Sequence, residues 1–205
     1  KYRNTGQTCV CANRIYVHQD VYEQFSEGFV KEAGKLQTGQ GFDPLADQGP
    51  LIDEAALAKV EEHVADAKNH GGEVILGGQP HELGGLFYEP TVIKNANDEM
   101  LVSYEETFGP VAPLFSFSTE EEVIERANNT PFGLASYFYT RDLAKSWRVS
   151  EQLEYGIVGL NTGIISTEMA PFGGVKESGM GREGSKYGID DYLEIKYISL
   201  AGIEE

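Results

Sequence analysis

The chain has 205 residues, of which 40% are hydrophobic and 24% charged, and this composition is typical of a globular protein with a sizeable core. Its formal net charge of −17, from 33 acidic against 16 basic residues, repels nucleic acid and anionic membrane, so we expect neither as a partner. There is no run of about 18 or more apolar residues, so we expect no membrane-spanning helix. Cys9 and Cys11 are too close in the chain for a disulfide between them to stabilise a domain, which favours a reducing, cytoplasmic location.

Helices alternate with strands along most of the chain. The apolar spacing predicts a first helix over residues 21–36, capped by Asp20 and closed by Gly39, and a second over residues 53–70. The further elements expected in chain order are strands at 73–76 and 113–117, a helix opened by Ser118 or Thr119, a strand at 134–139, a helix at 143–153 and a strand at 156–160. This alternation predicts an α/β fold with an open, mostly parallel sheet covered by helices on both faces.

The C-terminal part of the chain follows a different pattern. Residues 192–198 alternate strictly between apolar and polar side chains, which predicts a long extended strand. No crossover remains after it, so the strand has no partner in this chain, and we expect its edge to pair with another copy.

Both cysteines lie in an apolar, uncharged stretch near the N-terminus, and Gly6 precedes them. A thiol is nucleophilic as the thiolate, so Cys9 is a candidate nucleophile if its surroundings stabilise that form. The alternative is that Cys9 and Cys11 are small buried hydrophobic residues, as most free cysteines are.

A second candidate segment is residues 105–110, where two carboxylates precede an aromatic residue and a Gly-Pro break. This sequence predicts a sharp turn that presents Phe108 and at least one carboxylate from a loop, and residues 171–174 present Phe172 in the same way. In both places the alternative is an ordinary turn with solvated side chains. The four histidines, His18, His63, His70 and His81, have no metal-ligand spacing, so we expect them on the surface and expect no metal site.

Three segments, in order, resemble the aldehyde dehydrogenase superfamily: residues 6–9, residues 105–110, and Asn161 with residues 171–174. The resemblance covers essentially the whole chain. Residues 2–4, the Cys9 and Cys11 pair, and the segments 154–166 and 184–192 look like the succinate-semialdehyde dehydrogenases in particular. Dehydrogenases of related semialdehydes, such as glutarate semialdehyde, are the close alternatives.

The resemblance implies oxidation of an aldehyde to a carboxylic acid with NAD or NADP. Cys9 would attack the carbonyl as a thiolate, hydride would leave the thiohemiacetal for the nicotinamide, and water would hydrolyse the thioester, while the Cys9 N–H stabilises the oxyanion. By the same carry-over, Glu106 would bind the nicotinamide ribose and Phe108 would pack near the nicotinamide. Neither contact distinguishes NAD from NADP.

Recognition of the substrate is carried over in the same way. Arg3 would bind a distal carboxylate of the aldehyde, since a guanidinium matches a carboxylate bidentately; the alternative is a surface ion pair. Ser166 would add a hydrogen bond, with neighbouring Thr167 as the alternative, and Phe172 would line the pocket. Cys11 would serve a redox-regulatory role by forming a reversible disulfide with Cys9.

The resemblance also implies a domain organisation. Residues 1–188 would form the catalytic domain and residues 189–205 an oligomerisation strand in a homodimer or homotetramer. In the family the cofactor-binding domain, the general-base glutamate and an oxyanion asparagine lie upstream of the cysteine, and none is in this chain. By itself the chain would therefore be inactive. The alternative of another class is a non-catalytic assembly module.

Overall fold

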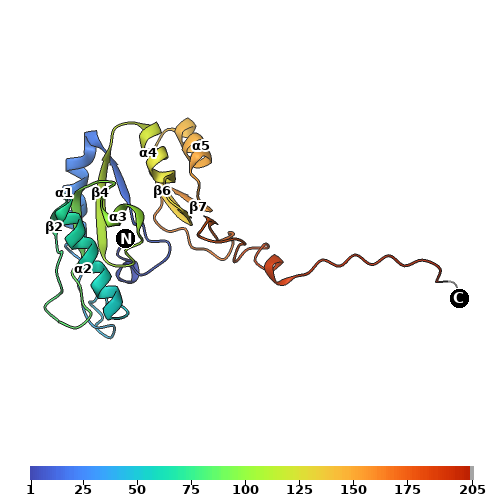
Figure 1. The fold of residues 1–205 in the computed structure, drawn as a ribbon, viewed down its shortest axis with the longest axis horizontal. Coiled ribbons are helices and arrows are strands. Elements are labelled where there is room, and N and C mark those ends of the chain that lie inside the picture. The colour runs from blue at the N-terminus through green and yellow to red at the C-terminus, as the bar shows by residue number, and fades with distance from the viewer. Residues whose placement is uncertain (204–205) are drawn as a thin grey trace. The chain divides into compact units, whose positions relative to one another are not determined.

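The computed structural model describes residues 1–203, which form two compact units, Lys1–Thr130 and a second unit that begins at Pro131 (Figure 1). Within the described residues, no helix combines the length and the apolar character needed to cross a membrane. The predicted boundary at residue 188 separates a catalytic domain from an oligomerisation strand by their functions, and this assignment stays a prediction.

The first unit is built on a four-stranded sheet in the order β1-β4-β3-β2. Strands β1 (Ile15–His18) and β3 (Thr91–Ala96) both run parallel to β4 (Val111–Phe117), and β2 (Glu73–Leu76) lies antiparallel to β3 at the edge. The prediction of an α/β fold with a mostly parallel sheet is confirmed. The sequence patterns identified β2 and β4 but not β1 or β3, although β3 is one of the two central strands.

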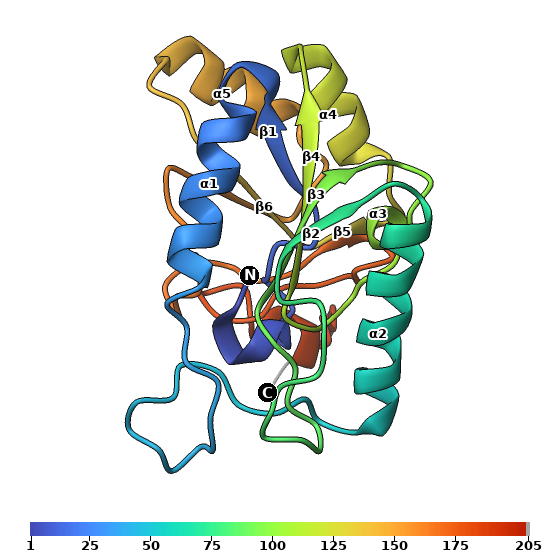
Figure 2. The same cartoon turned by 90° about the vertical axis from the view of Figure 1, so that its left-hand side faces the viewer.

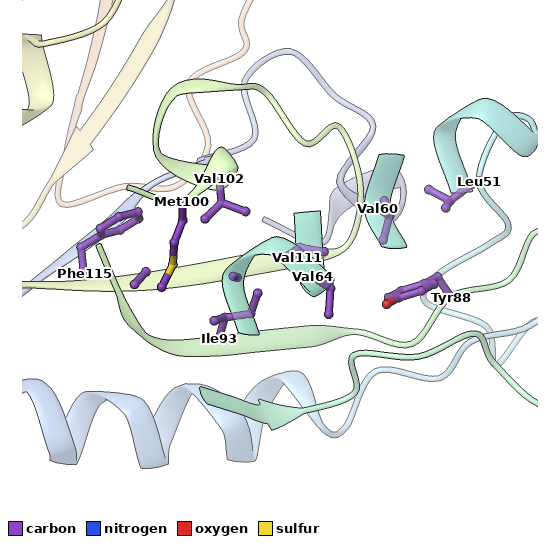
Figure 3. Close-up of a cluster of buried hydrophobic side chains, with 11 residues drawn as sticks. Leu51, Val60, Val64, Tyr88, Ile93, Met100, Val102, Val111 and Phe115 are labelled. Atoms are coloured by element: carbon purple, nitrogen blue, oxygen red, sulfur yellow. The ribbon is translucent and has the colours of Figure 1, made fainter. Parts of the chain in front are cut away.

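Two helices cover opposite faces of this sheet, α1 (Tyr22–Ala33) and α2 (Glu54–Asn69) (Figure 2). Alternate residues of the central strands point to the two helices: Val92 and Leu114 lie in the cluster that contains α1, whereas Ile93 and Phe115 lie in the cluster that contains α2. Figure 3 shows the larger, α2-side cluster, which includes Leu51, Val60, Val64, Tyr88, Ile93, Met100, Val102, Val111 and Phe115. Each fully buried aliphatic side chain contributes about 1.5–3 kcal/mol, so this cluster fixes α2 firmly on the sheet.

The ends of α1 differ from the prediction. Asp20 does not cap the helix, because it lies inside a 3-10 turn, η2 (Gln19–Val21), where its N–H donates to the His18 side chain. The helix ends at Ala33 with Gly34 as its C-cap, and the predicted terminator Gly39 belongs to the following loop, where its N–H donates to the Gln48 carbonyl at 2.9 Å. Tertiary hydrogen bonds in the loop therefore end the helix earlier than its apolar period suggests.

The other predicted helices of this unit have side-chain caps. The Asp53 carboxylate accepts the Ala56 N–H at 2.8 Å and begins α2, as expected for a helix starting there. Thr119, rather than Ser118, caps α4 (Glu120–Asn128) and accepts the Glu122 N–H, and a short helix, α3 (Leu101–Tyr104), precedes β4.

In the second unit, β6 (Ala135–Phe138) and β7 (Ile157–Leu160) pair in parallel, with α5 (Leu143–Gln152) between them in the chain. These elements confirm the predicted strand, helix and strand within one or two residues. A small antiparallel pair, β5 (Phe132–Gly133) with β8 (Val175–Lys176), was not predicted, and a 3-10 turn, η3 (Asp190–Tyr192), comes near the end.

The predicted strand at 192–198 is not assigned in the described residues. Tyr192 ends η3, and residues 193–203 carry no helix or strand, although the backbone at Leu193 is extended. Their apolar side chains are exposed, among them Leu193, Ile195, Tyr197, Ile198, Leu200 and Ile203. An extended segment becomes a strand only when a neighbour supplies the hydrogen bonds. Its pairing with another copy of the chain stays a prediction.

Candidate active site

The cysteine loop, which we define as residues 3–11, begins with an unusual backbone. It starts with a 3-10 turn, η1 (Arg3–Gly6), in which Asn4, Thr5 and Gly6 all have left-handed φ angles of 49°, 60° and 77°. A Cβ atom at Gly6 would overlap the carbonyl of Gly109. Gly6 is therefore required for the cysteine loop to lie directly against residues 105–110, which we call the acidic loop.

Side chains anchor the cysteine loop to the segment before α2. Thr5 Oγ1 donates to the Gly49 carbonyl at 3.0 Å, and Gln7 Nε2 donates to the Pro50 carbonyl at 3.3 Å. The Ile52 N–H in turn donates to Gln7 Oε1 at 2.8 Å. These three bonds hold the backbone immediately before Cys9 in place, which is what a positioned nucleophile needs.

The two cysteines are free thiols in different environments. Cys9 is exposed, and Cys11 is half-buried. The Cys11 N–H bonds the Thr8 carbonyl at 2.9 Å and its Sγ lies 3.6 Å from the Arg3 carbonyl, so residues 8–11 form a turn. Over residues 1–203 no acceptor binds the Cys9 N–H. The alternative interpretation of Cys9 as a buried hydrophobic residue is therefore wrong.

Arg3 lies on the same loop with an exposed side chain. Its guanidinium makes no ion pair within the described part of the chain, while its carbonyl accepts a hydrogen bond from Thr8 Oγ1 at 3.4 Å. The preceding Tyr2 fixes this end of the loop, because its hydroxyl donates to the Thr91 carbonyl at 2.8 Å and its ring packs on Phe29. Arg3 therefore has a fixed backbone and a free cationic end.

The acidic loop follows α3 and has the predicted turn. Glu106 is exposed, and Phe108 has a φ of 46° with its ring 39% exposed, whereas Thr107 between them is buried. The expectation of an aromatic ring and a carboxylate presented from a loop is confirmed. The Glu106 carboxylate can accept hydrogen bonds from a ribose diol, and the exposed ring of Phe108 can pack against a nicotinamide. These two residues therefore fit NAD(P).

Asn13 joins the two loops. Its Oδ1 accepts hydrogen bonds from Lys1 Nζ at 3.1 Å and from the Thr107 N–H at 3.3 Å, and its Nδ2 donates to the Cys11 carbonyl at 3.3 Å. Burial lowers the pKa of the Lys1 ammonium to about 8, while nearby Cys11 and Glu106 oppose the shift. No pattern in the sequence singled out Asn13 or Lys1.

His63 contradicts the expectation of a surface histidine, because it lies on the buried face of α2 and its side chain is fully inaccessible. Its Nδ1 lies 3.1 Å from Thr107 Oγ1, and its Nε2 lies 3.4 Å from Glu105 Oε2. Burial, and then the charge of Lys59, lower the pKa of His63, and Glu105 opposes this. The available signal was helical spacing, since residue 63 falls on the same face as the buried positions 60, 64 and 67.

The second unit brings together the remaining predicted residues. Ser166, Thr167 and Phe172 line one open pocket, which also contains Glu168, Glu183 and Gly184. Phe172 is fixed there by two backbone hydrogen bonds with Glu183, at 2.9 and 2.6 Å. The first unit holds Arg3, Cys9, Cys11, Glu106 and Phe108 on the two touching loops described above.

Residues 1–198 match the model of the aldehyde dehydrogenase family, and the chain belongs to this family. It is 60% identical to a 3-sulfolactaldehyde dehydrogenase of Pseudomonas putida, 61% to a glutarate-semialdehyde dehydrogenase of Pseudomonas aeruginosa and 60% to an NADP(+) succinate-semialdehyde dehydrogenase of Escherichia coli. These alignments cover 100%, 99% and 98% of this chain. The chain spans 42% of the length of each of these relatives.

Solved structures agree with the family assignment. A succinate-semialdehyde dehydrogenase from Burkholderia pseudomallei is 57% identical with a TM-score of 0.95, over 97% of this chain and 41% of that one. An NAD+ complex of an aldehyde dehydrogenase from Bacillus cereus is 36% identical with a TM-score of 0.91, over 95% of this chain and 40% of that one.

Proposed function

We propose that this chain is the catalytic part of an NAD(P)+-dependent aldehyde dehydrogenase subunit that oxidises an aldehyde carrying a distal anionic group, with succinate semialdehyde as the first candidate. The observation that carries the proposal is the exposed Cys9 on a loop anchored by three hydrogen bonds. An anchored, accessible thiol is what nucleophilic attack on a carbonyl requires.

Cys9 acts as the nucleophile: its thiolate adds to the aldehyde carbon, and the carbonyl oxygen becomes an oxyanion. The unbonded Cys9 N–H is available to donate to that oxyanion, and removal of one such donor typically costs about a hundredfold or more in rate. NAD(P)+ supplies the hydride acceptor when it is bound. Glu106 and Phe108 position its ribose and nicotinamide, and the base that activates water for thioester hydrolysis comes from a part of the subunit outside this chain.

Arg3 selects the substrate. Its free guanidinium, six residues before Cys9, offers a bidentate partner to an anion at the far end of the aldehyde. The names of the three relatives support this choice, because succinate semialdehyde, glutarate semialdehyde and 3-sulfolactaldehyde each carry a carboxylate or sulfonate besides the aldehyde. Ser166 and Phe172, which lie in the second unit, are further candidate substrate-binding residues, and glutarate semialdehyde is the second candidate substrate.

The cofactor is NADP or NAD. The name of the Escherichia coli relative supports NADP, and the Bacillus cereus structure in complex with NAD+ supports NAD. The subunit forms a homodimer or homotetramer through its C-terminal segment, whose apolar side chains are exposed in the single chain. Two free thiols are consistent with a reducing compartment, and we propose the cytoplasm.

The nucleophile is tested in the complete subunit with Cys9→Ser and the matched control Cys11→Ser. We expect Cys9→Ser to abolish NAD(P)H formation from succinate semialdehyde, since a hydroxyl lacks the nucleophilicity of a thiolate, and Cys11→Ser to retain it. Substantial turnover by Cys9→Ser would overturn the assignment. A complete wild-type subunit without any aldehyde oxidation would instead favour the non-catalytic assembly module.

The substrate class is tested with Arg3→Ala. Loss of a charge-assisted contact lowers kcat/KM for succinate semialdehyde by about 10- to 150-fold, mainly through KM. An uncharged aldehyde of the same length, butanal, serves as the control substrate and should change little. Parallel assays with glutarate semialdehyde and 3-sulfolactaldehyde rank the candidates, and equal losses on butanal and on the anionic substrates would refute recognition by Arg3.

A further inference from the structure

His63 is a buried titratable side chain to which the chemistry above assigns no role. It lies on α2, between the buried Val60 and Val64, and its ring is completely inaccessible. It approaches the acidic loop on both sides of Glu106: Thr107 Oγ1 is 3.1 Å from Nδ1, and Glu105 Oε2 is 3.4 Å from Nε2.

The chemistry of these neighbours assigns the tautomer. The lowered pKa of His63 means that the ring is neutral at pH 7, with one N–H donor and one acceptor. An ionised carboxylate such as Glu105 only accepts, whereas the Thr107 hydroxyl can donate. The proton therefore sits on Nε2, facing Glu105, and Nδ1 accepts from Thr107. Nε2 lies 3.4 Å from Glu105 Oε2 and makes no hydrogen bond within the described residues.

We propose that His63 is a positioning residue that holds the acidic loop in its cofactor-binding conformation through its hydrogen bond to Thr107, with Glu105 close to the other ring nitrogen. The inference rests on the proposed function of Glu106 and Phe108. Thr107 separates these two residues, and its backbone N–H also binds Asn13 of the segment that follows Cys9. A bond from α2 to the Thr107 side chain therefore fixes the direction in which both neighbouring side chains leave the loop.

The backbone of the loop needs such support. Phe108 has a left-handed φ of 46°, which is unfavourable for a non-glycine residue and persists only where neighbouring contacts impose it. Gly109, next in the chain, packs closely on Val60, the residue one turn before His63 on α2. Val60 and His63 thus present one apolar and one polar contact from the same helical face to the same loop.

The proposal is tested in the complete subunit with His63→Leu, His63→Asn and Thr107→Val. Leucine removes both contacts, asparagine keeps an acceptor near the Nδ1 position, and valine removes only the hydroxyl. Val64→Ala is the control, since it weakens the same buried face of α2 without a polar contact to the loop.

We expect His63→Leu and Thr107→Val each to raise the Kd and KM for NAD(P)+ by about three- to tenfold, the usual effect of one lost hydrogen bond. The KM for the aldehyde and the alkylation rate of Cys9 should change less than about twofold, since single lost contacts act locally. His63→Asn should restore cofactor binding substantially. The double variant should be no worse than either single variant, because both remove the same bond.

Two measurements are independent of turnover. Histidine-selective ¹⁵N spectra of the wild type should show His63 protonated on Nε2 at pH 7, with a shifted Nδ1 signal in Thr107→Val. Amide hydrogen exchange at Thr107 and Phe108 should accelerate in His63→Leu and not in Val64→Ala.

An Nδ1–H tautomer, unchanged cofactor affinity in Thr107→Val, or an equal loss of affinity in Val64→Ala would each overturn the role of His63. If His63→Leu does not fold, Thr107→Val and His63→Asn decide the question. Absence of NAD(P)+-dependent turnover in the wild type would refute the proposed function, and the spectra and exchange rates would still decide whether His63 holds the loop.

Discussion

Gly6→Ala tests whether the contact between the cysteine loop and the acidic loop determines both stability and the position of Cys9. Gly6 has a φ of 77°, and an added Cβ would overlap the backbone carbonyl of Gly109. The left-handed conformation costs alanine about 1–2 kcal/mol, and forced overpacking adds about 1–3 kcal/mol. We therefore expect the free energy of unfolding to fall by about 2–5 kcal/mol, because a backbone carbonyl cannot rotate away as a side chain can.

Gly28→Ala is the matched control with the opposite sign. Gly28 lies in the middle of α1, and nothing lies within 4 Å of its added Cβ. Alanine should raise stability there by about 0.5–1 kcal/mol, since glycine is the poorer helix former.

The free energy of unfolding of both variants is measured by urea denaturation, and the reactivity of Cys9 is measured as its rate of alkylation by iodoacetamide. The alkylation rate should change in Gly6→Ala, whose loop must move, and stay constant in Gly28→Ala. Surface substitutions without structural consequence change the free energy of unfolding by up to about 0.5 kcal/mol. If Gly6→Ala changes it by no more than that and leaves the reactivity of the Cys9 thiol unchanged, the reasoning is refuted.

Three further predictions concern His63, the C-terminal segment and the two cysteines. The pKa of His63 in the folded protein lies below its usual value of 6.5, so the unfolded chain binds the proton more tightly. The free energy of unfolding should therefore decline as the pH falls from about 6.5 to the folded-state pKa. Denaturant titrations should show a smaller decline over this pH range in His63→Asn. Deletion from Tyr192 onward should yield smaller, aggregation-prone species by light scattering, because the apolar side chains of residues 193–203 are exposed in the single chain and are expected to pair with another copy. An unchanged oligomer would contradict this. Mild peroxide should inactivate the enzyme reversibly by joining Cys9 to Cys11 in a disulfide. Dithiothreitol should restore activity, and Cys11→Ala should abolish this recovery. If the mass spectrum of the oxidised peptide that contains both cysteines shows no loss of two hydrogens, the switch is rejected.

Local sequence determined the elements whose signals are local. The α2 helix was predicted because its apolar residues recur with a helical period and Asp53 supplies a side-chain cap. The strand, helix and strand of the second unit were predicted for similar reasons. The motif at 105–110 likewise predicted a loop presenting Phe108, because a Gly-Pro break turns the chain whatever surrounds it.

The missed strands show the limit of these patterns. Strand β3 is buried on both faces, so its sequence has no clean alternation, and β1 is only four residues long. The C-terminal segment shows the opposite case: residues 192–198 alternate as a strand should, yet no partner among residues 1–203 supplies the hydrogen bonds. A strand is a property of a pair, and a sequence pattern describes only one member.

The sequence by itself determined the family, through motifs at residues 6–9, at residues 105–110, and at Asn161 with residues 171–174, and it identified Cys9 as the candidate nucleophile. Only the tertiary structure decided how these motifs meet: Gly6 packs on Gly109, Asn13 links both loops, and His63 reaches Thr107 from α2. The physical reason is that exposure, hydrogen-bond partners and pKa shifts depend on neighbours brought close by folding. His63 and Thr107 are 44 residues apart in the chain, and no local pattern records their contact.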